Sequence, residues 1–167
     1  RGLDTPIRGL CIDLDGTLLD TAPDLAAASN AMLADLGREP LDLARVATFV
    51  GKGADVLIQR CLAATGGGAE DPSRFATARE HWHRHYEQIN GRYARLFPGV
   101  SEGLADLRSR GVELACITNK PGAFVPPLLE QFGLAPAFRF WIAGDTVATK
   151  KPEPGQLLEA ARRFGLA

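Results

Sequence analysis

Residues 8–17 read RGLCIDLDGT, a short apolar run that ends abruptly in two aspartates and a glycine. Such a run is typical of a buried parallel strand that ends where the acidic residues begin. We therefore expect Asp13 at the carboxyl end of a strand and a sharp turn at Gly16. This arrangement places two carboxylates, those of Asp13 and Asp15, close together at the edge of a sheet.

The sequence after this turn has only helical patterns. Apolar residues recur at helical spacing in residues 25–36, 43–50, 54–64 and 75–89, and no convincing strand is found between positions 20 and 95. A block of helices after one strand predicts an inserted helical bundle rather than a simple βα crossover. We therefore expect a helical cap domain at residues 21–95.

From residue 96 onward, helical and strand patterns alternate. Strands are expected at residues 112–118 and 138–143, and helices at residues 101–110, 123–132 and 154–164. Strands separated by helices predict a doubly wound parallel sheet, whose ligands bind beyond the carboxyl ends of the strands. The expected fold class is α/β, with a Rossmann-like core of residues 1–20 and 96–167 that carries the helical cap.

Composition excludes several classes of partner. The 167 residues include 19 Lys and Arg and 20 Asp and Glu, a formal net charge of −1, so we expect neither nucleic acid nor an anionic membrane as a partner. Three cysteines without a C-x-x-C pair suit a reduced, cytoplasmic compartment. No apolar run approaches the roughly 18 residues of a membrane span. The oligomeric state stays open.

The two aspartates suggest metal-assisted chemistry. Carboxylate oxygens together with water and phosphate are the ligands that Mg²⁺ prefers. One aspartate can attack phosphorus and form an aspartyl phosphate, while a second carboxyl group gives and takes a proton. Asp-Gly turns are also common, so the alternative from spacing alone is a pair that merely caps a turn.

Two later segments carry groups suited to phosphate. Residues 116–121 (CITNKP) end a strand with the hydroxyl of Thr118 and the amide of Asn119, immediately before a helix. Residues 150–154 (KKPEP) place lysines before a helix that begins with proline, where a lysine can balance the charge of a nucleophile and a phosphate. The alternatives are an N-cap for the first segment and a solvated surface lysine for the second.

In this order, the three motifs resemble the haloacid dehalogenase superfamily of phosphatases, and the likeness covers nearly the whole chain. Residues 18–25 (LLDTAPDL), 50–57 (VGKGADVL) and 118–121 (TNKP) are most similar to bacterial phosphoglycolate phosphatases, and the helical insert resembles the C1 cap of the superfamily. The resemblance implies hydrolysis of a small phosphomonoester, with 2-phosphoglycolate as the expected substrate. Another sugar or acid phosphate, or a phosphosugar mutase activity, stays open because the cap sets the substrate.

The resemblance also implies a role for each motif residue. Asp13 would be the nucleophile and a magnesium ligand, and Asp15 would be the acid/base and give magnesium its backbone carbonyl. Lys151 would balance the charge. The presence of Asp15 favours phosphate hydrolysis over carbon–halogen cleavage. The phosphate would be held by Thr118, Asn119 and Gly16.

The expected cap contains two further groups of interest. Gly51, Lys52 and Gly53 precede a helix, so they could meet the carboxylate of a substrate when the cap closes, or they could form a flexible surface turn. His81 and His85 lie at i and i+4 on one helical face. No glutamate follows His81, so we expect a solvated face there rather than a zinc site.

The superfamily has a fourth motif, a strand that ends in Gly-Asp with further acidic residues, which completes the magnesium site. The chain reaches Ala167 without such a strand, so we expect that it lacks the C-terminal part of the family and binds magnesium weakly. Asp145 precedes Lys151, against the order of the family, and is not assigned to metal. The alternative of a different class is an inactive phosphate-binding or regulatory module.

Overall fold

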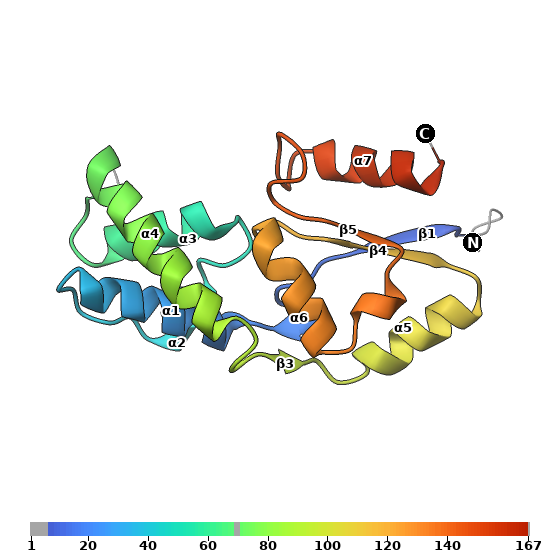
Figure 1. Ribbon diagram of the computed structural model, residues 1–167, viewed down its shortest axis with the longest axis horizontal. Coiled ribbons are helices and arrows are strands. Elements are labelled where there is room, and N and C mark those ends of the chain that lie inside the picture. Colours follow the sequence, from blue (N-terminus) through green and yellow to red (C-terminus); the bar gives the residue numbers. More distant parts are fainter. Residues whose placement is uncertain (1–6, 69–70, 167) are drawn as a thin grey trace.

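The structure is a computed structural model that describes residues 7–68 and 71–166. It consists of an α/β layer joined end to end with a cluster of helices (Figure 1). Strands β1 (Gly9–Ile12), β4 (Glu113–Ile117) and β5 (Phe140–Ile142) form a parallel sheet in the order β1-β4-β5. The carboxyl ends of β1 and β4 therefore lie side by side, as the sequence predicts for a doubly wound core.

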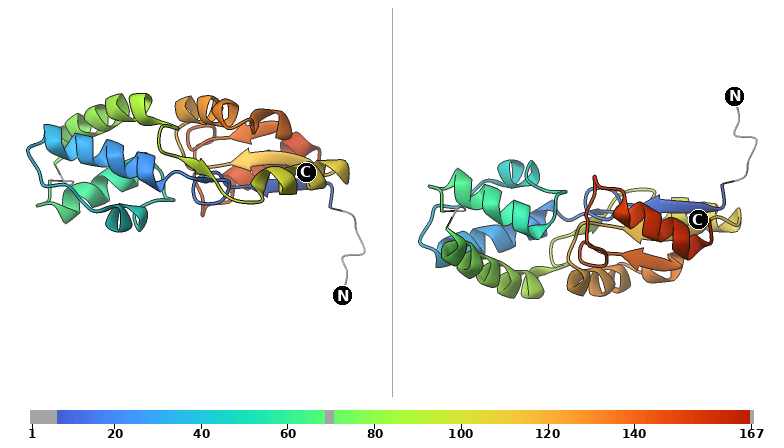
Figure 2. Two further views of the ribbon diagram at one scale, coloured as in Figure 1. Left: turned by 90° about the horizontal axis from the view of Figure 1, so that it is seen from below. Right: turned by 90° about the horizontal axis from the view of Figure 1, so that it is seen from above.

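Helices cover both faces of this sheet because successive side chains of a buried strand point to opposite faces. Leu114 and Cys116 of β4 pack in one cluster with residues of α5 (Val100–Ser109) and α6 (Val125–Gln131). Ile117 packs on the other face, against α7 (Gly155–Phe164). Figure 2 shows α7 on one side of the sheet and α5 and α6 on the other.

The helical cluster is made of four helices that follow β1 in sequence. They are α1 (Ala22–Asp35), α2 (Leu43–Ala47), α3 (Ala54–Ala64) and α4 (Pro72–Ile89). All four of the helices expected between positions 20 and 95 are present, and α3 has the expected bounds. They bury a hydrophobic core of their own, in which Met32, Ile58 and Trp82 are almost completely excluded from solvent. Short 3-10 helices, η1 (Gly122–Phe124) and η2 (Ala135–Ala137), flank α6.

The two chain segments that join the helical cluster to the sheet run side by side. Strand β2 (Leu19–Asp20) pairs antiparallel with β3 (Arg95–Leu96), a two-residue ladder that sequence periodicity does not detect. Asp24 strengthens this junction, because its buried carboxylate accepts the backbone N–H groups of Gly91 at 2.8 Å and Tyr93 at 2.6 Å. The connection is therefore fixed by hydrogen bonds as well as by packing.

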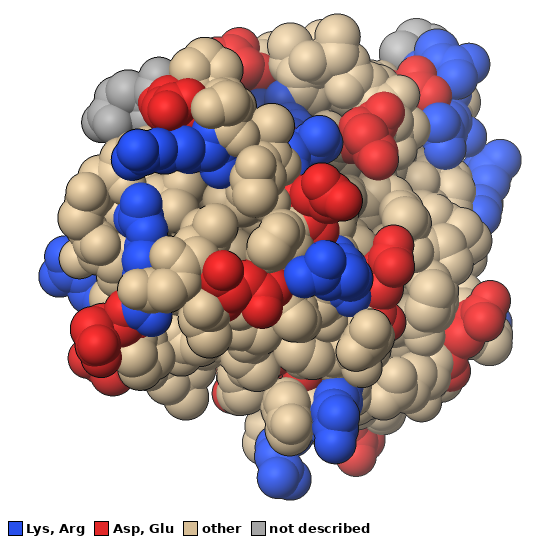
Figure 3. Space-filling view, turned by 60° about the vertical axis from the view of Figure 1, so that its left-hand side comes forward, with Lys and Arg blue, Asp and Glu red and all other residues tan. Residues whose placement is uncertain are grey.

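The face formed by the helical cluster carries charges of both signs. Figure 3 shows Lys and Arg side chains interspersed with Asp and Glu there, without a continuous area of one sign. Among the helices in the described part of the chain, none is both long enough and apolar enough to cross a membrane.

Candidate active site

The carboxylate of Asp13 lies directly beyond β1, at the carboxyl edge of the sheet. Its Oδ1 accepts the backbone N–H of Leu14 at 2.8 Å and lies 2.8 Å from Nζ of Lys151. The Asp13 side chain is 40% exposed, so a ligand in solution can reach it. The structure thus brings the expected nucleophile and the expected charge-balancing lysine together, although they are 138 positions apart in sequence.

Asn119 holds the loop that presents Lys151. Its amide nitrogen donates to the carbonyl of Lys151 at 2.9 Å and to that of Gly51 at 3.0 Å, and its Oδ1 accepts the backbone N–H of Lys151 at 2.9 Å. The Lys151 ammonium also donates to the carbonyl of Ile117 at 2.8 Å. Both amide hydrogens of Asn119 are therefore used to position the lysine loop and the helical cluster, and a direct contact with phosphate stays a prediction.

Thr118 keeps a free hydroxyl proton at the end of β4. The side chain is buried, and its Oγ1 accepts the backbone N–H of Lys120 at 3.1 Å. No acceptor for that hydroxyl is found within the described residues. The carbonyl of Thr118 accepts Nε2 of Gln156 at 2.9 Å, which fixes the strand end. Thr118 is therefore suited to donate to a phosphate oxygen.

Gly16 forms the turn after Asp15. Its φ of +81° lies in the left-handed region that glycine adopts without strain, and its N–H donates to the carbonyl of Leu19 at 2.8 Å. That N–H is therefore already satisfied, so Gly16 shapes the turn that aims the two aspartates. Its expected contact with phosphate stays a prediction.

Asp15 belongs to a buried network that the sequence does not reveal. Its Oδ1 accepts the hydroxyl of Thr21 at 2.6 Å and Nζ of Lys120 at 2.9 Å, and the same Nζ donates to the hydroxyl of Tyr86 in α4. Burial acts to lower the pKa of Lys120, but the Asp15 carboxylate and Tyr86 outweigh it, so this pKa lies above its ordinary value. Burial raises the pKa of Tyr86 to about 12. Lys120 is therefore a buried cation and Tyr86 a neutral phenol.

The carboxyl ends of β1 and β4 face the helical cluster across a cavity of about 30 Å³, room for roughly two water molecules. Asp13, Asp15, Thr118 and Asn119 line it on the sheet side. Its other lining residues include Leu25, Val50, Leu57, Trp82 and Tyr86.

Two of the three expected cap residues line this cavity. Gly51 and Gly53 are in its wall, whereas Lys52 is exposed and outside it. At Gly53 φ is +91°, and a Cβ there would lie 3.2 Å from the carbonyl oxygen of Asn119. Glycine at this position therefore permits close approach of the helical cluster to the core.

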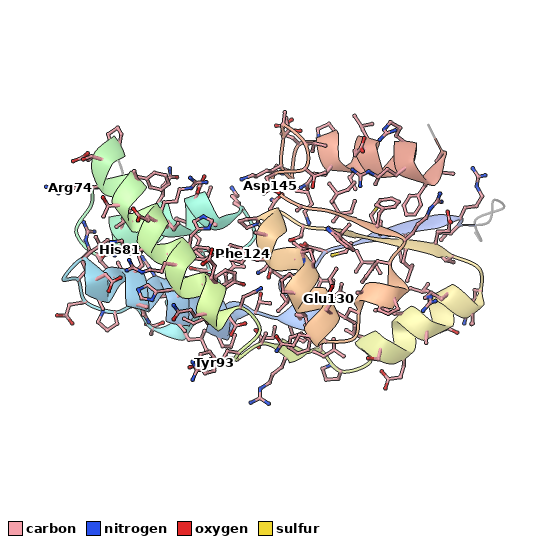
Figure 4. The ribbon with its side chains drawn as sticks, in the orientation of Figure 1. Arg74, His81, Tyr93, Phe124, Glu130 and Asp145 are labelled. Atoms are coloured by element: carbon pink, nitrogen blue, oxygen red, sulfur yellow. The ribbon has the colours of Figure 1, made fainter. Side chains whose placement is uncertain are left out.

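Two histidines of α4, His81 and His85, contact the carboxylate of Asp35 and do not line the cavity. Nδ1 of His81 lies 2.9 Å and Nε2 of His85 lies 2.7 Å from Oδ2 of Asp35, which Arg84 also contacts at 2.8 Å. The hydrogen bond from His85 is the largest factor that lowers the pKa of Asp35. Asp145 likewise lies outside the cavity lining, in the loop before α7 (Figure 4), where its carboxylate accepts the N–H of Gly122 at 3.0 Å.

The family model of haloacid dehalogenase-like hydrolases matches residues 7–167, and the chain belongs to this family. It is 43% identical over 167 residues to phosphoglycolate phosphatase of Thiobacillus denitrificans, covering all of this chain and 74% of the relative. It is 45% identical to phosphoglycolate phosphatase of Nitrosospira multiformis, covering 95% of this chain and 70% of the relative. The crystal structure of a predicted phosphoglycolate phosphatase from Haemophilus somnus superposes with a TM-score of 0.91 at 33% identity, covering 98% of this chain and 74% of that one.

Proposed function

We propose that this hydrolase cleaves phosphomonoesters through an aspartyl phosphate formed on Asp13. The observation that carries the proposal is the pairing of an accessible Asp13 carboxylate with Lys151 at 2.8 Å, in a cavity that Asp15 and Thr118 also line. A carboxylate nucleophile needs a nearby cation that offsets its charge and that of the incoming phosphate. The family of the chain and the names of its relatives support the same reaction.

The reaction has two steps. In the first, a carboxylate oxygen of Asp13 attacks phosphorus, the P–O ester bond breaks, and a proton from the Asp15 carboxyl group passes to the departing alcohol oxygen. In the second, water attacks the same phosphorus and gives a proton back to Asp15, while the bond between phosphorus and Asp13 breaks. Lys151 and the hydroxyl of Thr118 stabilise the charge on the phosphoryl oxygens during both steps.

The residues at the end of β1 fit a magnesium ion. No hydrogen bond within the described residues occupies Oδ2 of Asp13 or the backbone carbonyl of Asp15, and hard oxygen donors with adjacent phosphate are the ligands that Mg²⁺ takes. The described residues contain no group of three His, Cys, Asp or Glu side chains suited to a metal, so water, phosphate or groups other than these residues would fill the remaining positions. When bound, the ion would neutralise phosphoryl oxygens.

We propose 2-phosphoglycolate as the substrate. The names of the curated relatives support this choice, and each of them is longer than the chain described here. In this proposal residues 21–95 act as a cap over a core of residues 1–20 and 96–167. Because the cavity is narrow, the cap opens to admit substrate, and on closing it brings Gly51, Lys52 and Gly53 to the substrate carboxylate.

A panel of phosphomonoesters tests the substrate. The full-length gene product, supplied with Mg²⁺, is expected to give its highest kcat/KM on 2-phosphoglycolate, and Asp13→Asn is expected to abolish turnover of every ester. In Lys52→Met, KM should rise for 2-phosphoglycolate and stay unchanged for phenyl phosphate, which has no carboxylate. Equal rates on all esters would contradict the substrate, and an unreduced rate in Asp13→Asn would contradict the nucleophile.

A further inference from the structure

Lys120 is a fully buried lysine for which the two-step reaction above has no role. Only 2% of its side chain is exposed, and it follows Thr118 and Asn119 directly at the end of β4. Its ammonium donates to Oδ1 of Asp15 at 2.9 Å and to the hydroxyl of Tyr86. A buried charge is costly unless it is paired and hydrogen-bonded, so these two contacts are what keeps Lys120 in place.

The contacts of Asp15 are unequal between its two oxygens. Oδ1 accepts both Lys120 and the hydroxyl of Thr21, at 2.9 and 2.6 Å. Oδ2 has no hydrogen bond to any of the described residues, and Asp15 lines the cavity. Two donors on one oxygen fix the rotation of the carboxylate and leave the other oxygen for proton transfer.

Tyr86 is rigidly held on the side of the helical cluster. It is fully buried, its ring stacks on Trp82 with centroids 4.6 Å apart, and Phe124 of η1 meets it edge-on at 4.8 Å. Figure 4 shows Phe124 at the start of α6, where the core faces α4. A tyrosine locked in this way presents its hydroxyl at a fixed point, and Lys120 is bound to that point.

We propose that Lys120 and Tyr86 are positioning residues for proton transfer by Asp15, with Oδ2 as the oxygen that carries the proton. The proposal rests on the proposed function. In the first step the proton moves from Oδ2 to the ester oxygen, which receives the electron pair of the breaking P–O bond. Because Tyr86 belongs to α4 and Lys120 to the core, Asp15 is fully positioned only when the helical cluster is docked as it is here.

Leaving groups of different basicity distinguish this role from a purely structural ion pair. Phenyl phosphate and p-nitrophenyl phosphate have nearly the same shape, but the nitrophenolate departs with little need of a proton. A variant that misplaces the proton donor should therefore lose more kcat/KM on phenyl phosphate than on the nitrophenyl ester. A change in folding or in ester binding alone should lower both values by the same factor.

The experiment measures both esters with the full-length gene product and Mg²⁺ in Lys120→Met and Tyr86→Phe. Relative to wild type, the ratio of kcat/KM on p-nitrophenyl phosphate to that on phenyl phosphate should rise on the order of tenfold or more in Lys120→Met and about threefold in Tyr86→Phe. Tyr93→Phe removes a hydroxyl from an exposed tyrosine and should leave the ratio unchanged.

If Lys120→Met does not fold, Tyr86→Phe decides the matter, since it removes a single hydroxyl and keeps the ring. If the wild-type protein hydrolyses both esters and Tyr86→Phe has the same ratio as wild type, the inference is overturned and the proposed function stands. A wild-type protein that hydrolyses neither phenyl phosphate nor 2-phosphoglycolate overturns the proposed function, and the inference with it.

Discussion

Replacing Lys151 with methionine should separate catalysis from stability. At 2.8 Å, the Coulomb energy between Lys151 and Asp13 is about 6 kcal/mol for an effective dielectric constant of about 20. The two side chains are 28% and 40% exposed, so water reduces the net value in the resting protein to about 1 kcal/mol or less. In the transition state the phosphoryl group adds negative charge beside the same ammonium, and loss of such a stabilising group costs about 3 to 4 kcal/mol.

We therefore expect Lys151→Met to lower kcat on 2-phosphoglycolate by about 10²- to 10³-fold, while the free energy of unfolding changes by about 1 kcal/mol or less. The measurements are steady-state kinetics with Mg²⁺ and denaturant unfolding of the same samples. Lys150→Met is the matched control, because Lys150 is the adjacent lysine and is exposed. Equal losses in the two variants, or a kcat within threefold of wild type in Lys151→Met, would show that Lys151 does not stabilise the phosphoryl group.

Three substitutions and one control substitution test the junction and the helical cluster. Burial raises the pKa of Asp24, so the part of its contribution to stability that depends on pH is present below about pH 4 and is lost as pH rises through the raised value. The pKa of Asp35 is lowered, chiefly by His85, so its contribution is present above about pH 4 and is lost as pH falls. Chemical unfolding between about pH 3 and 6 measures the difference in unfolding free energy between wild type and each variant. The difference from Asp24→Asn should fall as pH rises, and the difference from Asp35→Asn should rise. Slopes of the same sign would contradict this. Gly53→Ala should destabilise more than Gly37→Ala, by about 1 kcal/mol or more in thermal unfolding, because both have positive φ but only Gly53 lies against Asn119. Equal losses would show that close approach at Gly53 does not matter.

The sequence predicts the elements whose signals are local. Residues 8–13 indicate β1 because a short apolar run ends in acidic residues, and the helical spacing of residues 54–64 gives the bounds of α3. The pair of β2 and β3 escapes prediction because each strand has two residues and 74 residues lie between the two strands. Such a ladder has no period to detect, and only the folded chain brings its halves together.

Some residues of the candidate site can be predicted from the sequence, and others cannot. Asp13 and Lys151 are predictable because each belongs to a motif with a recognisable order along the chain. Lys120 and Tyr86 are not predictable as partners, because they are 34 positions apart in sequence. Lys120 and Asp15, which also share a hydrogen bond, are 105 positions apart. Tyr86 lies within the helical pattern of residues 75–89 and is buried in the folded chain. The sequence offers one local indication of this network: a tyrosine buried in a helical core needs a hydrogen-bond partner for its hydroxyl.

The proposed reaction depends on an aspartyl phosphate at Asp13. The most direct test is to quench the full-length gene product during turnover of 2-phosphoglycolate with Mg²⁺, and to treat it with borohydride, which reduces an acyl phosphate to homoserine. Peptide mass spectrometry should then find homoserine at position 13, dependent on substrate and absent without it. Sustained turnover with Asp13 unmodified, or with homoserine at position 15 instead, would show that Asp13 is not the nucleophile.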